Sequence, residues 1–226
     1  MEAQTYRQLC ITCLQPQVTC YCPHIRRFDP LINFVILIHP LECRRRIATG
    51  RMSHLCLENS FLIRGHDYSK NETVNDLIAD PRRQCVMLYP GVQSKNLSSL
   101  SSVERAAIFS PDKILTIFVI DGTWATAKKM VKHSKNLIDL PRVCFTPPTP
   151  SNFRVRKQPH PGCYSTIEAI HHTIELVGPS RGFQTNLRQH DRLLHTFETM
   201  VEQQLAFIEK SRERSGPSRY RQPLEV

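Results

Sequence analysis

Apolar residues follow two distinct patterns along the middle of the chain. Some runs are apolar throughout, which is typical of strands buried on both faces of a parallel sheet. They predict strands at residues 31–38, 61–63, 85–89, 114–120 and 142–145. Between them, apolar residues recur at helical spacing and predict helices at residues 44–59, 72–79, 124–135, 166–178 and 187–212. Because strands and helices take turns, we predict an α/β fold with a mostly parallel sheet flanked by helices.

The last predicted helix has the clearest apolar face, and we expect that face to pack on the core. Its members are Leu187, His190, Leu194, Phe197, Val201, Leu205 and Ile208. Residues 96–102, in contrast, are rich in serine and predict a surface loop. Residues 213–226 combine arginine with serine, glycine and proline, and we expect them to form a flexible basic tail.

The most apolar strand, 114–120, stops abruptly at Asp121-Gly122-Thr123-Trp124, which contains the only tryptophan. In open α/β sheets, ligands bind at the carboxyl ends of the strands, so a carboxylate at that point is a candidate for chemistry. A plain turn explains the same residues, because Asp-Gly is common in turns and Thr123 can cap the following helix.

Three other segments with unusual sequences also follow predicted strands or loops. His39-Pro40-Leu41-Glu42 follows the first strand, Pro90-Gly91 follows the third, and Tyr164-Ser165-Thr166-Ile167-Glu168 opens a predicted helix. Several special loops converging on one sheet edge predict a single site. Ser165 and Glu168 also have the spacing of a capping box, which gives Glu168 a purely structural explanation. The N–H groups at that helix start remain available to a ligand carboxylate.

A long proline-rich segment, Phe145–Gly162, fits neither helix nor strand. Ordered loops of this length are usually functional. Phe153 lies there beside Arg154, Arg156 and Lys157, so the loop offers a stacking face together with phosphate partners, as recognition of single-stranded RNA requires. A mobile basic loop with a buried phenylalanine is the alternative.

The 226 residues carry a net charge of +10 with a pI near 9.3, which favours a polyanionic partner such as nucleic acid over a merely solvated basic surface. The charge is clustered around the predicted site, in residues 44–51, 128–132 and 154–157. The sequence has no stretch that predicts a membrane span and no pattern of a secretory signal, so we expect a cytoplasmic protein.

Four of the nine cysteines, Cys10, Cys13, Cys20 and Cys22, lie close together near the start of the chain. Two close pairs in a cytoplasmic protein predict four thiolates around one zinc ion rather than disulfides. Such a site has no open coordination position, so the zinc is expected to be structural. The unusual C-x-C spacing of the second pair leaves another ligand set or a redox role open. We therefore divide the chain into a zinc-binding module, residues 1–28, and an α/β domain, residues 29–212.

Taken together, these motifs resemble the DTW-domain family, the tRNA-uridine aminocarboxypropyltransferases. The match rests on Asp121-Gly122-Thr123-Trp124, on the four cysteines, on Thr49-Gly50-Arg51, on Pro90 and on Tyr164-Ser165-Thr166-Ile167-Glu168-Ala169. One departure is Ala48, where the family pattern has asparagine. The motifs extend from residue 10 to residue 169, so the resemblance covers most of the chain.

The resemblance implies a knotted fold like that of the SPOUT superfamily and a transfer of the 3-amino-3-carboxypropyl group from S-adenosylmethionine to N3 of a tRNA uridine. Asp121 is then expected to act as general base or as electrostatic anchor, and Trp124 to stack on a base, although core packing is an equal alternative. The cofactor-binding residues would be Leu88, Tyr89, Pro90, Ile120, Asp121, Gly122, Thr123, Tyr164, Ser165 and Thr166. The tRNA-binding residues would be Arg44, Arg45, Arg51, Lys128, Arg154, Arg156 and Lys157.

Two other functions remain open from the sequence. An S-adenosylmethionine-dependent RNA methyltransferase would use the same cofactor, since a fold does not determine the reaction. A zinc-containing RNA-binding protein without catalysis would keep the basic clusters and the cysteine module, but it would not need Asp121 at a strand end.

Overall fold

The computed structural model describes residues 8–156 and 162–215. Of the predicted basic tail, residues 213–215 belong to the last helix, and the remainder lies outside the described residues, as does Lys157. None of the described helices combines the length and the apolar character that crossing a membrane requires.

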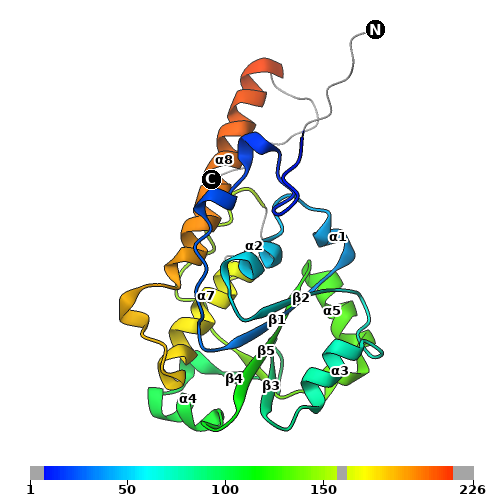
Figure 1. Cartoon of the computed structure of the whole chain (residues 1–226), viewed down its shortest axis with the longest axis vertical. Coiled ribbons are helices and arrows are strands. Elements are labelled where there is room, and N and C mark those ends of the chain that lie inside the picture. Colours follow the sequence, from blue (N-terminus) through cyan, green and yellow to red (C-terminus); the bar gives the residue numbers. More distant parts are fainter. Residues whose placement is uncertain (1–7, 157–161, 216–226) are drawn as a thin grey trace.

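A six-stranded, fully parallel sheet forms the centre of the fold, with the strand order β2-β1-β5-β3-β6-β4 (Figure 1). The strands are β1 (Asn33–Ile38), β2 (Ser60–Arg64), β3 (Arg83–Leu88), β4 (Lys95–Asn96), β5 (Ile114–Asp121) and β6 (Arg142–Cys144). The five predicted strands and the α/β class are thereby confirmed. β5 lies between β1 and β3, which explains why its sequence is the most apolar.

Helices cover both faces of this sheet. They are α1 (Pro40–Cys43), α2 (Thr49–Cys56), α3 (Glu72–Ala79), α4 (Ser102–Ile108), α5 (Trp124–His133), α6 (Lys135–Ile138), α7 (Thr166–Val177) and α8 (Asp191–Ser215). Figure 1 shows α2, α4 and α7 on one side of the sheet and α3 and α5 on the other. Alternate residues of β1 supply the two cores: Phe34 and Ile36 face α2 and α7, while Val35 and Leu37 pack with α3 and α5.

The structure corrects several predicted boundaries. Within the helix expected at 44–59, only Thr49–Cys56 (α2) is helical. The short helix α1 lies before that range, where Pro40 starts it and the His39 Nδ1 accepts a hydrogen bond from the Leu41 N–H. The expected loop at 96–102 contains the end of β4, a 3₁₀ turn at Leu97–Ser99 with Leu97 fully buried, and the start of α4.

The last helix starts later than predicted. Leu187 precedes α8 and is 58% exposed, so it does not belong to the apolar face. The face that packs on the core contains Phe197, Val201 and the partly buried Leu205, as predicted, together with Leu193 and Met200. The helical spacing and most of the predicted face are therefore confirmed, and Leu193 and Met200 are additions that the sequence pattern did not indicate.

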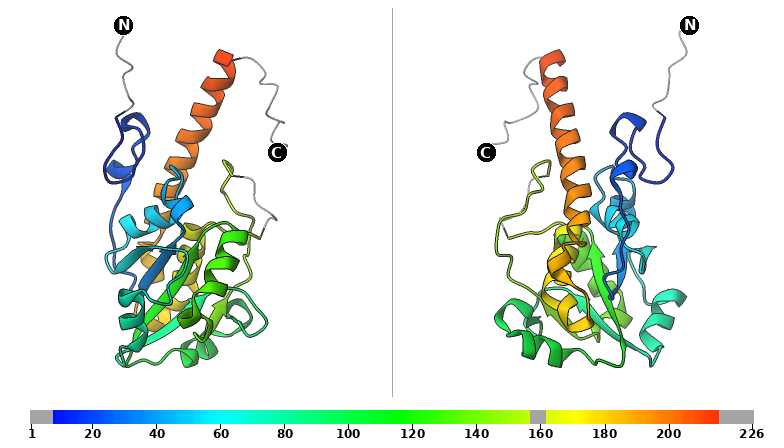
Figure 2. Two further views of the ribbon diagram at one scale, coloured as in Figure 1. Left: turned by 90° about the vertical axis from the view of Figure 1, so that its right-hand side faces the viewer. Right: turned by 60° about the vertical axis from the view of Figure 1, so that its left-hand side comes forward.

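The cysteine-containing segment packs against α8. Cys13 and Tyr21 are fully buried, and the Arg192 guanidinium donates to the Arg27 carbonyl oxygen at 2.8 Å. Figure 2 shows α8 projecting beyond the α/β body on the same side as this segment. The module is therefore joined to the main domain through a buried interface.

Candidate active site at the carboxyl edge of the sheet

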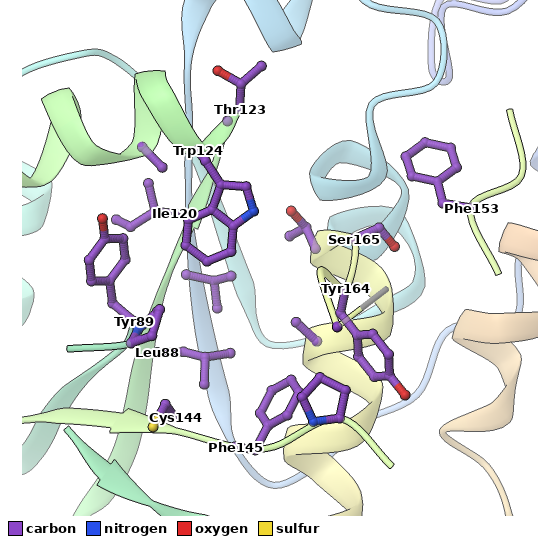
Figure 3. Close-up of a pocket in the computed structure, with 18 of the residues that line it drawn as sticks. Leu88, Tyr89, Ile120, Thr123, Trp124, Cys144, Phe145, Phe153, Tyr164 and Ser165 are labelled. Atoms are coloured by element: carbon purple, nitrogen blue, oxygen red, sulfur yellow. The ribbon is translucent and has the colours of Figure 1, made fainter. Parts of the chain in front are cut away.

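A cavity of about 640 Å³ opens where β3, β5 and β6 end (Figure 3). One wall consists of Leu88, Tyr89 and Pro90 after β3, and the end of β5 with the start of α5 provides another. The loop after β6 and the first turn of α7 close the remaining sides. The convergence of the special loops on one edge, predicted from the sequence, is therefore observed.

Every residue proposed for cofactor binding lines this cavity except Asp121. The lining members are Leu88, Tyr89, Pro90, Ile120, Gly122, Thr123, Tyr164, Ser165 and Thr166. The sequence singled out the segment Phe145–Gly162 as an RNA-binding loop, and the structure places its beginning at the cavity as well: Cys144 at the end of β6 and Phe145, Thr146 and Pro147 after it line the cavity. The available signal for this second role was the end of the predicted strand 142–145, because that strand ends at the same edge of the sheet.

Asp121 lies beneath the cavity rather than in its wall, and only 5% of the residue is exposed. Its Oδ1 accepts a hydrogen bond of 2.5 Å from the Thr166 hydroxyl, and Thr166 itself lines the cavity. Its Oδ2 is buried with no hydrogen-bond partner among the described residues. Burial raises the pKa of this carboxyl from 3.8 to about 6, against the opposing effect of the Thr166 hydroxyl.

Gly50, in the first turn of α2, lies directly against this carboxylate. A Cβ atom at position 50 would stand 2.4 Å from Asp121 Oδ2, a separation that real Cβ atoms do not show. Thr166 is the first residue of α7, so Asp121 lies between the amino ends of α2 and α7. The positive ends of two helix dipoles thus face one carboxylate, and the Thr49-Gly50-Arg51 motif gains a structural reason.

Trp124 is not a core residue, because it is 46% exposed at the start of α5. Its indole N–H donates to the Cys163 sulfur at 3.1 Å. Figure 3 shows the rings of Trp124 and Tyr164 on facing sides of the cavity. The turn before it holds Thr123 as N-cap of α5, accepting from the Thr126 N–H at 3.2 Å, so the capping expectation is confirmed as well.

Glu168 fastens the long loop to α7. The capping box is present, since the carboxylate accepts from the Ser165 N–H at 2.8 Å. The same carboxylate also accepts from the Ser151 hydroxyl and from the Asn152 N–H, both at 2.7 Å. One buried side chain therefore joins the start of α7 to the loop that closes the cavity.

The basic residues predicted to bind RNA fall into three environments. Arg44, Lys128 and Arg154 are exposed. Arg45 and Arg156 line the cavity, and both reach Oε1 of the buried Glu42, at 3.3 and 3.4 Å.

Arg51 is the exception among them. It is 8% exposed, and its guanidinium donates to the carbonyl oxygens of Cys43 and Arg45. These bonds tie α2 to the last residue of α1 and to the segment that follows it. The Arg51 guanidinium thus binds backbone carbonyl oxygens and is not available to a phosphate.

The four N-terminal cysteines form a group that could hold a metal ion, since their sulfur atoms all lie within 4.8 Å of one another. The Cys10 and Cys22 sulfurs are 3.7 Å apart, and those of Cys13 and Cys20 are 3.6 Å apart. The edge of a tetrahedron of thiolates around zinc is about 3.8 Å, given the usual zinc–sulfur distance. The donor type and the spacing therefore fit zinc.

A second group of donor atoms consists of His171, Glu175, His190 and Asp191, also within 4.8 Å of one another. Here the Arg188 guanidinium pairs with the carboxylates of both Glu175 and Asp191. The His171 Nε2–H donates to the Asp191 carboxylate and the His190 Nε2–H to the Glu175 carboxylate, both at 2.8 Å. Because Arg188 already pairs with both carboxylates, the cluster links α7 to the start of α8.

An α/β fold with a nucleoside-sized cavity at the carboxyl edge defines a class of proteins that bind a small ligand beside a basic surface. Comparison with known sequences narrows this class. A model of the DTW domain matches residues 7–205, and the chain belongs to the DTW-domain family.

Curated relatives share this domain. The chain is 33% identical over 168 residues to tRNA-uridine aminocarboxypropyltransferase 2 of Drosophila melanogaster, which covers 72% of this chain and 63% of the fly protein. It is 27% identical over 203 residues to the mouse protein of the same name, covering 88% of this chain and 66% of that one. With tRNA-uridine aminocarboxypropyltransferase A of Arabidopsis thaliana it is 26% identical over 205 residues. The alignments thus span a little less than two thirds of the fly and mouse proteins, and no solved structure matches the chain.

Proposed function

We propose that the chain is a tRNA-uridine aminocarboxypropyltransferase that moves the 3-amino-3-carboxypropyl group of S-adenosylmethionine to N3 of a tRNA uridine. The observation that carries this proposal is the cavity at the carboxyl edge, lined by Gly122, Thr123 and Trp124 of the DTW motif and by residues of two other segments that resemble the family, Pro90 and Tyr164–Thr166. The names of the relatives support the same activity. A cavity of about 640 Å³ suits a nucleoside with an amino-acid chain.

In the proposed reaction, uridine N3 attacks the carbon of the aminocarboxypropyl group that is bonded to the sulfonium sulfur. The bond from that carbon to sulfur breaks, and sulfur keeps the electron pair, so methylthioadenosine leaves as a neutral molecule. The sulfonium makes each of its attached carbons electrophilic, and the contribution of the protein is to place one of them in line with N3. The strand-end segment Leu88–Pro90 and the loop after β6 provide the apolar walls for the adenosine part.

The proton on uridine N3 has to leave during this attack. We assign its transfer to Thr166 and Asp121, because the Thr166 hydroxyl lines the cavity and donates its own proton to Asp121 Oδ1. The hydroxyl oxygen can accept the N3 proton while its hydrogen passes to the carboxylate. With its pKa raised to about 6, Asp121 is a stronger proton acceptor than an ordinary aspartate and is still ionised at neutral pH.

For the nucleic acid, the half-exposed Trp124 offers an indole face on which the target uracil can stack. Arg44, Lys128 and Arg154 are exposed, and each is next in the sequence to a residue of the cavity wall. We assign these three side chains to tRNA phosphates. Lys157 belongs to the same expected set but lies outside the described residues. The cytoplasmic location and the knotted SPOUT-like topology remain parts of this proposal, supported by family membership.

The cysteine group is assigned to one structural zinc ion, held by Cys10, Cys13, Cys20 and Cys22. When bound, the metal would cross-link the segment that packs on α8. Its four thiolate ligands leave no position for substrate, so the zinc takes no part in the transfer.

The test is mass spectrometry of nucleosides from unmodified tRNA incubated with the purified chain and S-adenosylmethionine, with methylthioadenosine and S-adenosylhomocysteine measured in the same reaction. Aminocarboxypropyl-uridine with an equal amount of methylthioadenosine is expected. A methylated nucleoside with S-adenosylhomocysteine would make the chain a methyltransferase. Binding of tRNA by the chain without formation of either modified nucleoside would favour an RNA-binding protein without catalysis.

A further inference from the structure

Glu42 is a buried carboxylate that the proposed reaction does not use. It lies in α1, 3% exposed, behind the cavity wall. Its Oε1 is 3.3 Å from the Arg45 guanidinium and 3.4 Å from that of Arg156. The two arginines come from separate segments, one after α1 and the other from the long loop, yet they meet on a single oxygen atom.

Both arginines keep most of their hydrogen-bonding capacity. A guanidinium has five N–H donors, and among the described residues Glu42 is the only acidic partner of either one. Both line the cavity. Two guanidiniums thus share the single oxygen Oε1 of Glu42, and the Asp121 carboxylate is a second negative charge that interacts with Arg156. The N–H donors that Glu42 leaves unused suit a carboxylate or a phosphate.

The position of the two arginines in the cavity favours a ligand carboxylate over a tRNA phosphate. The Arg156 N–H donates to the Phe153 carbonyl oxygen, so Arg156 lies on the Phe153 side of the cavity. Figure 3 shows Phe153 on the opposite side from Leu88 and Cys144, at the strand ends assigned to adenosine. A ligand that spans the cavity would therefore bring its far end to the arginines. In S-adenosylmethionine that end is the amino-acid part, which carries the α-carboxylate.

We propose that Glu42, Arg45 and Arg156 form the subsite for the α-carboxylate of the aminocarboxypropyl group, with Glu42 as the positioning residue for the two guanidiniums. This inference rests on the proposed function and deepens it. Anchoring the ligand at both ends determines which carbon on sulfur faces the uridine, because rotation about the sulfonium is then restricted. Arg45 and Arg156 thereby move from the predicted tRNA contacts to the donor site.

A pair of product-like ligands tests this assignment without requiring turnover. S-adenosylhomocysteine keeps the α-carboxylate, whereas methylthioadenosine lacks the whole amino-acid end. Calorimetric titration of each into the full chain should show that Arg45→Ala and Arg156→Ala weaken S-adenosylhomocysteine about tenfold or more, while methylthioadenosine changes less than about twofold. Glu42→Gln should give the same selective loss. Arg46→Ala, next to Arg45 and exposed, is the matched control and should alter neither ligand.

Three results would overturn the subsite. Equal weakening of both ligands would mean that the ion pairs only hold the loop in place. Unchanged ligand binding with weaker, less salt-dependent tRNA binding would assign the arginines to phosphates instead. If the unmutated chain bound neither adenosine ligand, the proposed function would fail along with the subsite, and this outcome is distinct from the other two because it needs no variant.

Discussion

Gly50 and Asp121 approach each other so closely that a single methyl group does not fit between them: a Cβ atom at position 50 would lie 2.4 Å from Asp121 Oδ2 and 2.7 Å from its Cγ. The two residues are 71 positions apart, and each belongs to a short motif of the family resemblance. Their contact presses the first turn of α2 onto the end of β5. The two motifs thus form one structural unit beneath the cavity.

Gly50→Ala is expected to destabilise the protein by about 1–3 kcal/mol, because the fully buried surroundings have to shift to admit the methyl group. Thermal and chemical unfolding would measure the loss. Gly91→Ala is the matched control, since a Cβ atom there meets only Arg142, at an ordinary 3.6 Å, and Gly91 lacks a positive φ. Equal stability of the two variants would show that the first turn of α2 yields freely and that the close approach imposes no constraint.

The sequence predicted which segments form this site but not which of their side chains face the cavity. The apolar run before Asp121 located the strand end, and the motifs after β3 and before α7 located the walls, because parallel strands bring their carboxyl ends to one edge. Nothing in the local pattern indicated that Asp121 would lie under the wall while Thr166 faces the cavity. That arrangement depends on how α2 and α7 pack against β5, which is a tertiary contact. α4 was missed for a related reason, since it has no fully buried residue to mark a periodic face.

The burial of Asp121 predicts a specific dependence of stability on pH. Its pKa is raised from 3.8 to about 6, so between these values the folded protein holds a proton that the unfolded chain has released. The free energy of unfolding should therefore fall as the pH rises from about 4 to about 6, by about 3 kcal/mol from this group. Asp121→Asn removes the titration, and the stability difference between the two proteins isolates it from other groups. A difference that does not vary over this pH range would contradict the assignment.

Glu168 should contribute more to stability than an ordinary capping glutamate, because it also holds Ser151 and Asn152 of the long loop. Glu168→Gln is expected to cost about 1.5–3 kcal/mol, since an amide replaces a buried carboxylate that accepts several hydrogen bonds. Glu104→Gln alters the corresponding capping box of α4 on the exposed surface and should change stability little. Limited proteolysis of the first variant should also cut residues 145–156 faster. Equal effects of the two substitutions would mean that the loop contacts add nothing.

Thr166 offers a direct test of the proton transfer. Thr166→Val keeps the shape of the side chain but removes the hydroxyl between the cavity and Asp121, so kcat should fall about 100-fold. Affinity for methylthioadenosine should change little, and Thr166→Ser should restore most of the rate because serine keeps the hydroxyl. Single-turnover kinetics of uridine modification would separate these effects from product release. Full activity of the valine variant would remove Thr166 from the reaction and leave Asp121 with a structural or electrostatic role.

The cysteine group predicts one zinc ion per chain with a structural effect. Removal of zinc by a chelator should lower the melting temperature and loosen the packing of residues 8–28 on α8, because the four thiolates, once unlinked, no longer restrain that segment. Cys20→Ser should release zinc and give the same loss. Cys85→Ser should retain zinc, because the Cys85 thiol lies outside this group and donates to the Leu77 carbonyl oxygen. Metal analysis of the purified chain and of both variants provides the measurement. Two equivalents of zinc in the unmutated chain, with one retained in Cys20→Ser, would mean that a second zinc ion displaces Arg188 from the group formed by His171, Glu175, His190 and Asp191. If the unmutated chain contained no zinc, the assignment of the cysteines would be wrong.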